Sequence, residues 1–87
     1  MTGSIRLMDQ GQSVVPAYGT LRVDGSPEPF ESPLNERGEF YLENVPPGTR
    51  RATVYYRGDT CTFTLTVPTT SATNIDLGVL QCRDISR

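Results

Sequence analysis

The segment at residues 60–67 constrains the fold most, because apolar residues alternate with threonine along its whole length. A period of two is typical of a β-strand that buries one face, whereas a helix repeats its apolar residues every three to four positions. Threonine also suits the pleated surface of a sheet. The segment therefore predicts a half-buried strand with an apolar inner face and a threonine-lined outer face.

A second strand is expected directly before it, at residues 51–57. Gly58-Asp59 lies between the two strands and is typical of the two-residue turn of a β-hairpin. A turn at these positions would pair Val54 with Phe63 and would give the hairpin one apolar and one polar face. We therefore expect a hairpin in this register.

Composition and turn residues extend the prediction to the whole chain of 87 residues, since seven prolines and eight glycines disfavour long helices. Residues 26–32 contain prolines and can form only an edge strand or a loop. We predict a single all-β domain, a small β-sandwich of about six to seven mostly antiparallel strands, with residues 1–3 disordered and residues 84–87 as a tail. Further strands are expected at residues 4–8, 17–23, 39–43 and 74–80.

Cys61 and Cys82 are the only cysteines, and their spacing fits neither a redox motif nor a zinc half-site. An even cysteine count suggests a bridge in a small secreted domain, whereas the same pair in the cytosol would more often be free. We predict a structural disulfide. Leu77 and Cys82 fall on opposite faces of a regular strand, so the bond requires a bulge near Gly78 or a crossing between sheets.

Composition argues against several classes of function. The chain has no histidine, which removes the commonest general base and metal ligand, and its net charge of −2 gives no cationic surface for nucleic acid. No apolar run is long enough to span a bilayer. Among the carboxylates, Asp24 with Glu28 and Glu31 lacks the ligand order of a calcium loop. We predict no catalytic, cofactor or metal site.

Two tyrosines are expected on polar faces, and both are candidates for contact with a partner protein. Tyr41 and Tyr55 should point away from the core, and Arg51 and Arg57 should lie along the face of Tyr55. Tyrosine and arginine are enriched at the centres of protein interfaces. Packing of Tyr55 against a threonine across the hairpin, or cover by a loop, would explain the same pattern without a partner.

The chain resembles the C-terminal periplasmic domain of outer-membrane fimbrial ushers, of the kind that assembles P pili and type 1 pili. The resemblance is carried by residues 38–48, by G-D-x-C-x-F-x-L at residues 58–65 and by the cysteine at position 82. Residues 38–48 alone are less specific, because transthyretin-like and carboxypeptidase-regulatory-like modules share that strand-and-turn pattern.

The resemblance implies a non-enzymatic role in the chaperone–usher pathway, without a cofactor. The usher is a β-barrel pore of the outer membrane. The resemblance places this domain on the periplasmic side of that membrane, as one part of an usher that also has the barrel, a plug and an N-terminal domain. There it would dock complexes of a periplasmic chaperone with a pilus subunit and would not itself span the membrane. The alternative is a structural spacer module, transthyretin-like or carboxypeptidase-regulatory-like, in another secreted protein. The sandwich expected in either case is immunoglobulin-like or transthyretin-like.

Overall fold

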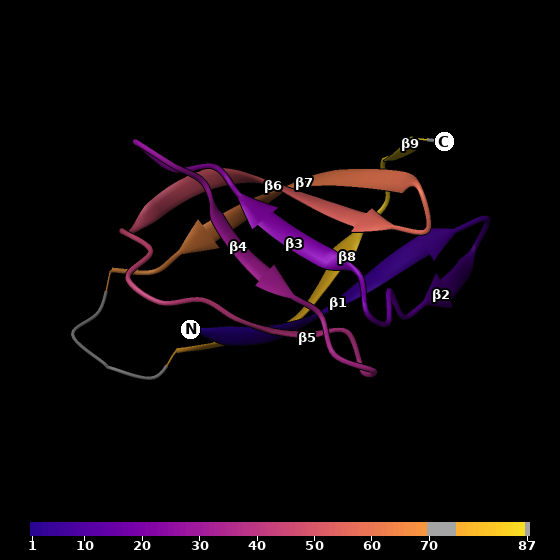
Figure 1. Cartoon of the computed structure of the whole chain (residues 1–87). Helices are drawn as coiled ribbons and strands as arrows, with labels where there is room; N and C mark the ends of the chain where they lie inside the picture. The colour runs from indigo at the N-terminus through magenta and orange to yellow at the C-terminus, as the bar shows by residue number, and fades with distance from the viewer. Residues whose placement is uncertain (70–74, 87) are drawn as a thin grey trace.

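The computed structural model describes residues 1–69 and 75–86, which form two packed β-sheets and no helix (Figure 1). This arrangement confirms the predicted all-β sandwich. The strands are β1 (Thr2–Asp9), β2 (Gln12–Val14), β3 (Thr20–Val23), β4 (Phe30–Pro33), β5 (Glu39–Tyr41), β6 (Gly48–Tyr56), β7 (Asp59–Val67), β8 (Asp76–Cys82) and β9 (Ile85–Ser86).

The first sheet is built around β1. β2 and β5 pair with it in antiparallel orientation, and β8 pairs with it in parallel orientation. Ser4 pairs with Glu39 of β5 and with Val79 of β8, so these two strands must lie on opposite edges of β1. The parallel pair is the one departure from antiparallel pairing among the described strands.

The second sheet has the strand order β4-β3-β6-β7-β9, and every neighbouring pair is antiparallel. The proline-containing segment continues into β4, which lies at the edge of this sheet, where proline costs no ladder hydrogen bond. The long β6–β7 hairpin forms the middle of the sheet (Figure 1).

The core lies between the two sheets and is filled by the alternating inward side chains of both. Removing these side chains from water is the main favourable contribution to folding. Its buried members are Ile5, Leu7, Leu21, Val23, Leu34, Phe40, Leu42, Ala52, Val54, Cys61, Leu65, Val67 and Cys82.

The turn between β6 and β7 differs from the expected one. It consists of Arg57 and Gly58, with φ angles of 52° and 83°, and it pairs Val54 with Cys61. Two positive φ values define a type I′ turn, whose twist matches that of the strands. The expected pairing of Val54 with Phe63 was therefore wrong by two residues. The predicted faces were nevertheless correct, because a shift of two preserves the alternation of side chains.

A bulge at Gly78 resolves the conflict between the faces of β8. The register of β8 against β1 shifts by one residue between Asp76 and Val79. Gly78 has a φ of 73°, and its amide donates a hydrogen bond of 2.9 Å to Asp76 Oδ1. The extra residue directs Cys82 into the core and leaves Val79 60% exposed. Of the two solutions left open by the sequence, the structure uses the bulge.

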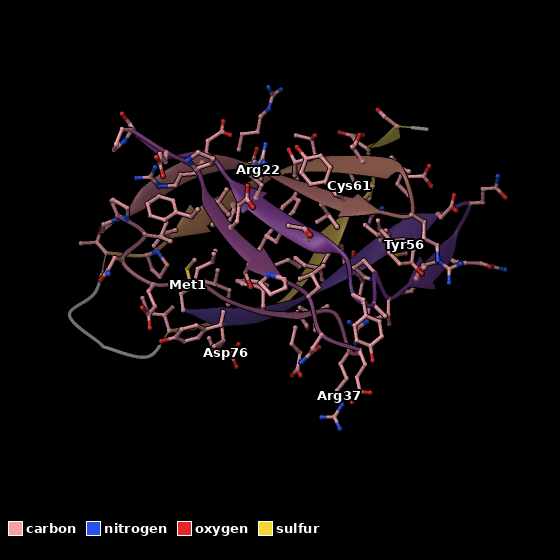
Figure 2. The ribbon with its side chains drawn as sticks, in the orientation of Figure 1. Met1, Arg22, Arg37, Tyr56, Cys61 and Asp76 are labelled. Carbon is pink, nitrogen blue, oxygen red and sulfur yellow. A yellow bond between two sulfur atoms is a disulfide. The ribbon has the colours of Figure 1, made fainter. Side chains whose placement is uncertain are left out.

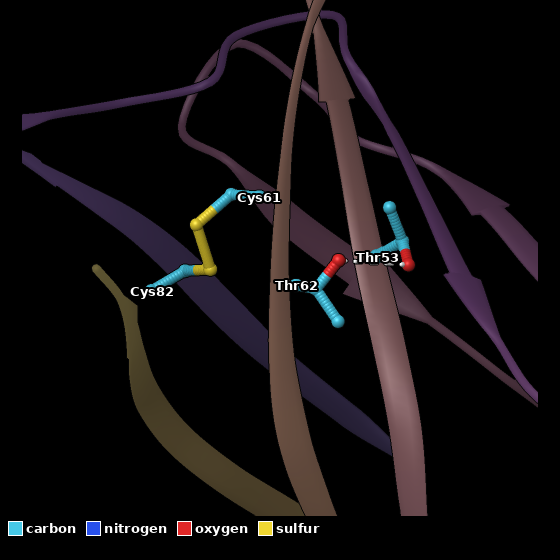
Figure 3. Close-up of a disulfide and its surroundings, with 4 residues drawn as sticks. All are labelled: Thr53, Cys61, Thr62 and Cys82. Carbon is cyan, nitrogen blue, oxygen red and sulfur yellow. Dashed lines mark hydrogen bonds between the residues drawn. A yellow bond between two sulfur atoms is a disulfide. The ribbon is translucent and has the colours of Figure 1, made fainter. Parts of the chain in front are cut away.

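The predicted disulfide between Cys61 and Cys82 is confirmed, with a Cα–Cα distance of 6.2 Å. Cys61 belongs to β7 and Cys82 to β8, so the bond crosses the core from the second sheet to the first (Figure 3). Both cysteines are buried. The sandwich is thus held together by a covalent link between its layers as well as by apolar packing.

The segments expected outside the domain take part in its sheets. Thr2 and Gly3 belong to β1, and the amino group of Met1 donates a hydrogen bond to the Leu42 carbonyl at 3.0 Å. At the other end, β9 pairs with the start of β7. The expected disorder at residues 1–3 was therefore wrong, and the expected tail contains a short strand. Backbone pairing holds both segments in the sheets. Each segment has too few residues to show an alternating pattern, so this pairing could not be predicted from the sequence.

Loss of the disulfide should lower the free energy of unfolding by about 3 kcal/mol, because the bond restricts a loop in the unfolded chain. The measurement is urea denaturation of the wild type and of the double variant Cys61→Ala/Cys82→Ala. Reductant should destabilise the wild type and leave the double variant unchanged, while intact mass reports the gain of two hydrogen atoms. Equal midpoints for the two proteins would show that the bond adds no stability.

The two phenylalanines Phe40 and Phe63 allow a matched test of the core. Phe40 is 3% exposed, and Phe40→Ala should lower the free energy of unfolding by about 3–5 kcal/mol. Phe63 packs against the core but is only partly buried, so Phe63→Ala should cost less. Urea denaturation of both variants measures the difference. An equal or larger loss at Phe63 would contradict the packing described here.

Candidate functional site

The outer face of the second sheet consists mainly of threonines. It is formed by the residues of β3, β6 and β7 that alternate with the core positions. On the two hairpin strands, Thr53 and Thr62 pair across the face, with their hydroxyl oxygens 3.5 Å apart. Figure 3 shows this threonine pair on the side of β7 opposite the disulfide. The other threonines on this face are Thr20, Thr49, Thr60, Thr64 and Thr66.

An aromatic ring and an ion pair interrupt this threonine surface. The guanidinium carbon of Arg22, which is labelled in Figure 2, lies 5.5 Å from the centre of the Tyr55 ring. Arg22 Nε donates a hydrogen bond of 2.9 Å to Glu31 Oε1, and a second guanidinium nitrogen lies 2.6 Å from the same oxygen. Neighbouring strands supply these side chains, since β3 pairs with both β4 and β6. We call Arg22, Glu31, Arg51 and Tyr55 the Arg22 patch.

The ion pair orders the patch more than it stabilises the fold. The side chains of Arg22 and Glu31 are 46% and 47% exposed, and an ion pair so open to water contributes little to stability. The hydrogen bond to Glu31, together with the charge of that carboxylate, raises the pKa of Arg22. Arg22 is thus held as a cation above the ring of Tyr55, which is itself 39% exposed.

Of the candidate residues, Arg51 and Tyr55 lie on this common face of β6, as predicted from the alternation. They are separated on the face by Thr53, which pairs with Arg22 of β3. Arg51 is exposed and pairs with Thr64 of β7. These two candidates therefore belong to one surface.

Arg57 lies elsewhere, and its predicted place beside Tyr55 was wrong. It occupies the first position of the β6–β7 turn, and its guanidinium carbon lies 5.2 Å from the centre of the Tyr56 ring. Tyr56 packs against the core on the other face of β6. The positive φ of Arg57 ends the strand one residue earlier than expected and removes Arg57 from the alternation.

Tyr41 belongs to the first sheet, in β5. It is 55% exposed, and its hydroxyl donates a hydrogen bond of 2.8 Å to Glu43 Oε1, which raises the pKa of Tyr41. Its amide donates to Ser32 Oγ at 3.1 Å, which brings it close to β4. A shallow depression of about 420 Å³ lies between Tyr41 and Glu31. Tyr41 thus borders the Arg22 patch without being part of it.

The sequence did not identify Arg22 and Glu31 as members of the site. The alternation in β3 does place Arg22 outward, between the buried Leu21 and Val23. Its contacts with Glu31 and Tyr55 arise because β4 and β6 lie beside β3. The sequence pattern does not reveal this order of strands.

The described part of the chain contains neither a metal-binding cluster nor a membrane-spanning helix. Within residues 1–69 and 75–86, no three histidine, cysteine or acidic side chains cluster closely enough to hold a metal ion. The same residues include no helix of the length and apolarity needed to cross a membrane. A scan of protein-family models gives no match for the chain, and no curated protein is significantly similar to it.

The hydrogen bond between Tyr41 and Glu43 gives a prediction for alkaline pH. The folded-state pKa of Tyr41 lies above the ordinary value of about 10. The stability that this bond contributes is therefore complete below about pH 10 and is lost as the pH rises through the folded-state pKa. Glu43→Gln should lower the pKa of Tyr41, as measured by NMR titration of the tyrosine ring carbons.

Glu39→Gln is the matched control for this titration. Glu39 lies in β5, as Tyr41 does, but its carboxylate accepts a hydrogen bond from the Asn35 side chain at 2.9 Å. The control variant should leave the pKa of Tyr41 unchanged. A pKa of Tyr41 that is the same in the wild type and in Glu43→Gln would contradict this assignment.

Proposed function

We propose that the chain is a non-enzymatic docking domain and that the Arg22 patch is its contact surface. The observation that carries the proposal is the position of Arg22, held by Glu31 above the half-exposed ring of Tyr55. Tyrosine and arginine supply much of the binding energy at protein interfaces. Here both come from neighbouring strands of one sheet, which gives them a rigid support.

The order of the patch favours binding, because side chains already held in place lose less entropy when a partner arrives. The short threonines around the patch leave the arginine and tyrosine side chains accessible. The broad outer face of a sheet suits the surface of another protein, whereas small ligands usually occupy a concave site. The patch would contact a protein partner through the Tyr55 ring and through the hydrogen-bonding groups of Arg22 and Arg51.

We further propose that the partner is a complex of a periplasmic chaperone with a pilus subunit. This part rests on the sequence resemblance to the C-terminal domain of fimbrial ushers, which runs through residues 38–48 and 58–65. A disulfide inside a small sandwich suits the oxidising periplasm. The domain would then lie on the periplasmic side of the outer membrane, next to the other parts of an usher.

Tyr55→Ala should weaken binding to a purified chaperone–subunit complex by about tenfold or more, the usual loss at a central interface tyrosine. The domain should remain folded, because the ring lies on the outer face of the sheet. Isothermal titration calorimetry measures the affinity, and urea denaturation checks the fold. The complexes to use are those encoded in the genome that carries this chain.

Tyr18→Ala provides the matched control, since Tyr18 is 77% exposed and lies outside the Arg22 patch. It should leave the affinity unchanged. If the wild-type domain binds none of several chaperone–subunit complexes, the proposal fails and the spacer role is favoured. If Tyr55→Ala unfolds the domain, the outer face has been assigned wrongly.

A further inference from the structure

A shallow depression of about 440 Å³ adjoins the Arg22 patch and lies over β7. Arg51 lines it from the outer face of β6, and Arg83 and Asp84 line it from the connection between β8 and β9. Between these two sides, β7 contributes Phe63. The depression therefore lies where the two sheets meet, and Arg51 belongs both to it and to the Arg22 patch.

The disulfide ties the two sides of this depression together. Cys61 lies two positions before Phe63, and Cys82 lies directly before Arg83. Beyond Cys82, β9 pairs with β7, and the Ile85 amide donates a hydrogen bond to the Arg83 carbonyl at 3.1 Å. The two sides are thus held in place before a ligand arrives, which lowers the entropic cost of binding.

The charged groups at the depression favour a ligand with one negative charge. Arg51 and Arg83 supply two cations and Asp84 supplies one anion, and all three residues are exposed. Together they leave a single positive charge, which one carboxylate of a ligand would neutralise. A doubly charged phosphate would exceed it, and the net charge of −2 on the chain would repel a nucleic acid.

The side chains at the depression can bind both ends of an acidic side chain. Arg83 Nη2 donates a hydrogen bond of 3.2 Å to Gln81 Oε1, which positions the guanidinium. Arginine has five N–H donors, so this bond leaves others for a ligand, and Arg51 offers the same set. These donors match the two oxygens of a carboxylate. The partly buried ring of Phe63 adds an apolar surface beside them.

We propose that this depression is a carboxylate-binding part of the contact surface and takes a glutamate side chain of the partner protein. The carboxylate would lie between Arg51 and Arg83, and its methylene groups would cover the exposed part of the Phe63 ring. Aspartate has one methylene group fewer and would cover less of the ring. This inference rests on the proposed function, because it takes the chaperone–subunit complex as the partner.

NMR titration of the oxidised domain with a short capped peptide, acetyl-Ala-Glu-Ala-amide, tests the depression without the complex. The side-chain Nε–H signals of Arg51 and Arg83 and the amide signals of Phe63 and Thr64 should shift. The same peptide with glutamine in place of glutamate should shift them little, because charged hydrogen bonds are the stronger ones. Equal responses to the two peptides would overturn the proposal.

Charge variants then test the sign of the site, with amide spectra as the check on folding. Arg51→Gln and Arg83→Gln should each weaken binding of the glutamate peptide severalfold. Asp84→Asn should strengthen it severalfold, because it removes the negative charge at the depression. Arg37→Gln is the matched control and should change nothing, since Figure 2 shows Arg37 on the side of the molecule away from Arg22. Weaker binding in Asp84→Asn, or unchanged binding in both depression arginine variants, would contradict the proposal.

Arg83→Gln also separates this inference from the proposed function, because Arg83 lies outside the Arg22 patch. Calorimetry with the purified chaperone–subunit complex should show a severalfold loss of affinity in this variant. An affinity equal to that of the wild type, with Tyr55→Ala still impaired, would overturn the inference and leave the proposed function standing. If the wild type binds no complex, the proposed function fails, and the peptide titration alone decides whether the depression binds a carboxylate.

Discussion

The covalent bond between Cys61 and Cys82 fixes which way each face of β7 points, and the surfaces of the molecule follow from that. With Cys61 held in the core, the alternation of the strand sends its even-numbered threonines to the outer face. Because β6 is paired with β7 along its whole length, Arg51 and Tyr55 are carried outward as well. Interior and surface are thus set together by one strand.

The sequence predicts those parts of the fold that depend on local pattern. The period of two in β7 correctly gave its inner and outer faces, and an even cysteine count correctly gave the disulfide. The register of the hairpin was not predictable in the same way, because a type I′ turn with arginine at a positive φ is rare. The pairing of β8 with β1 also escaped prediction, since partners distant in sequence leave no local signal.

The candidate site also combines features that a single strand predicts with features that depend on the order of strands. The outward positions of Tyr55 and Tyr41 were predictable from single strands, and both are exposed. The contact of Arg22 with Tyr55 was not, because it requires β3 beside β6. The placement of Tyr41 in the other sheet required the same knowledge. A surface built from several strands becomes visible only when their order is known.

The bulge at Gly78 makes the length of β8 as important as its composition. Without that one additional residue, the regular alternation would turn Cys82 away from the core and toward solvent, although both cysteines would still be present. Cys61 would then be a buried thiol without a disulfide partner. Cys82 would be a surface thiol able to react with other molecules. A single backbone insertion thus separates an internal cross-link from a reactive surface group.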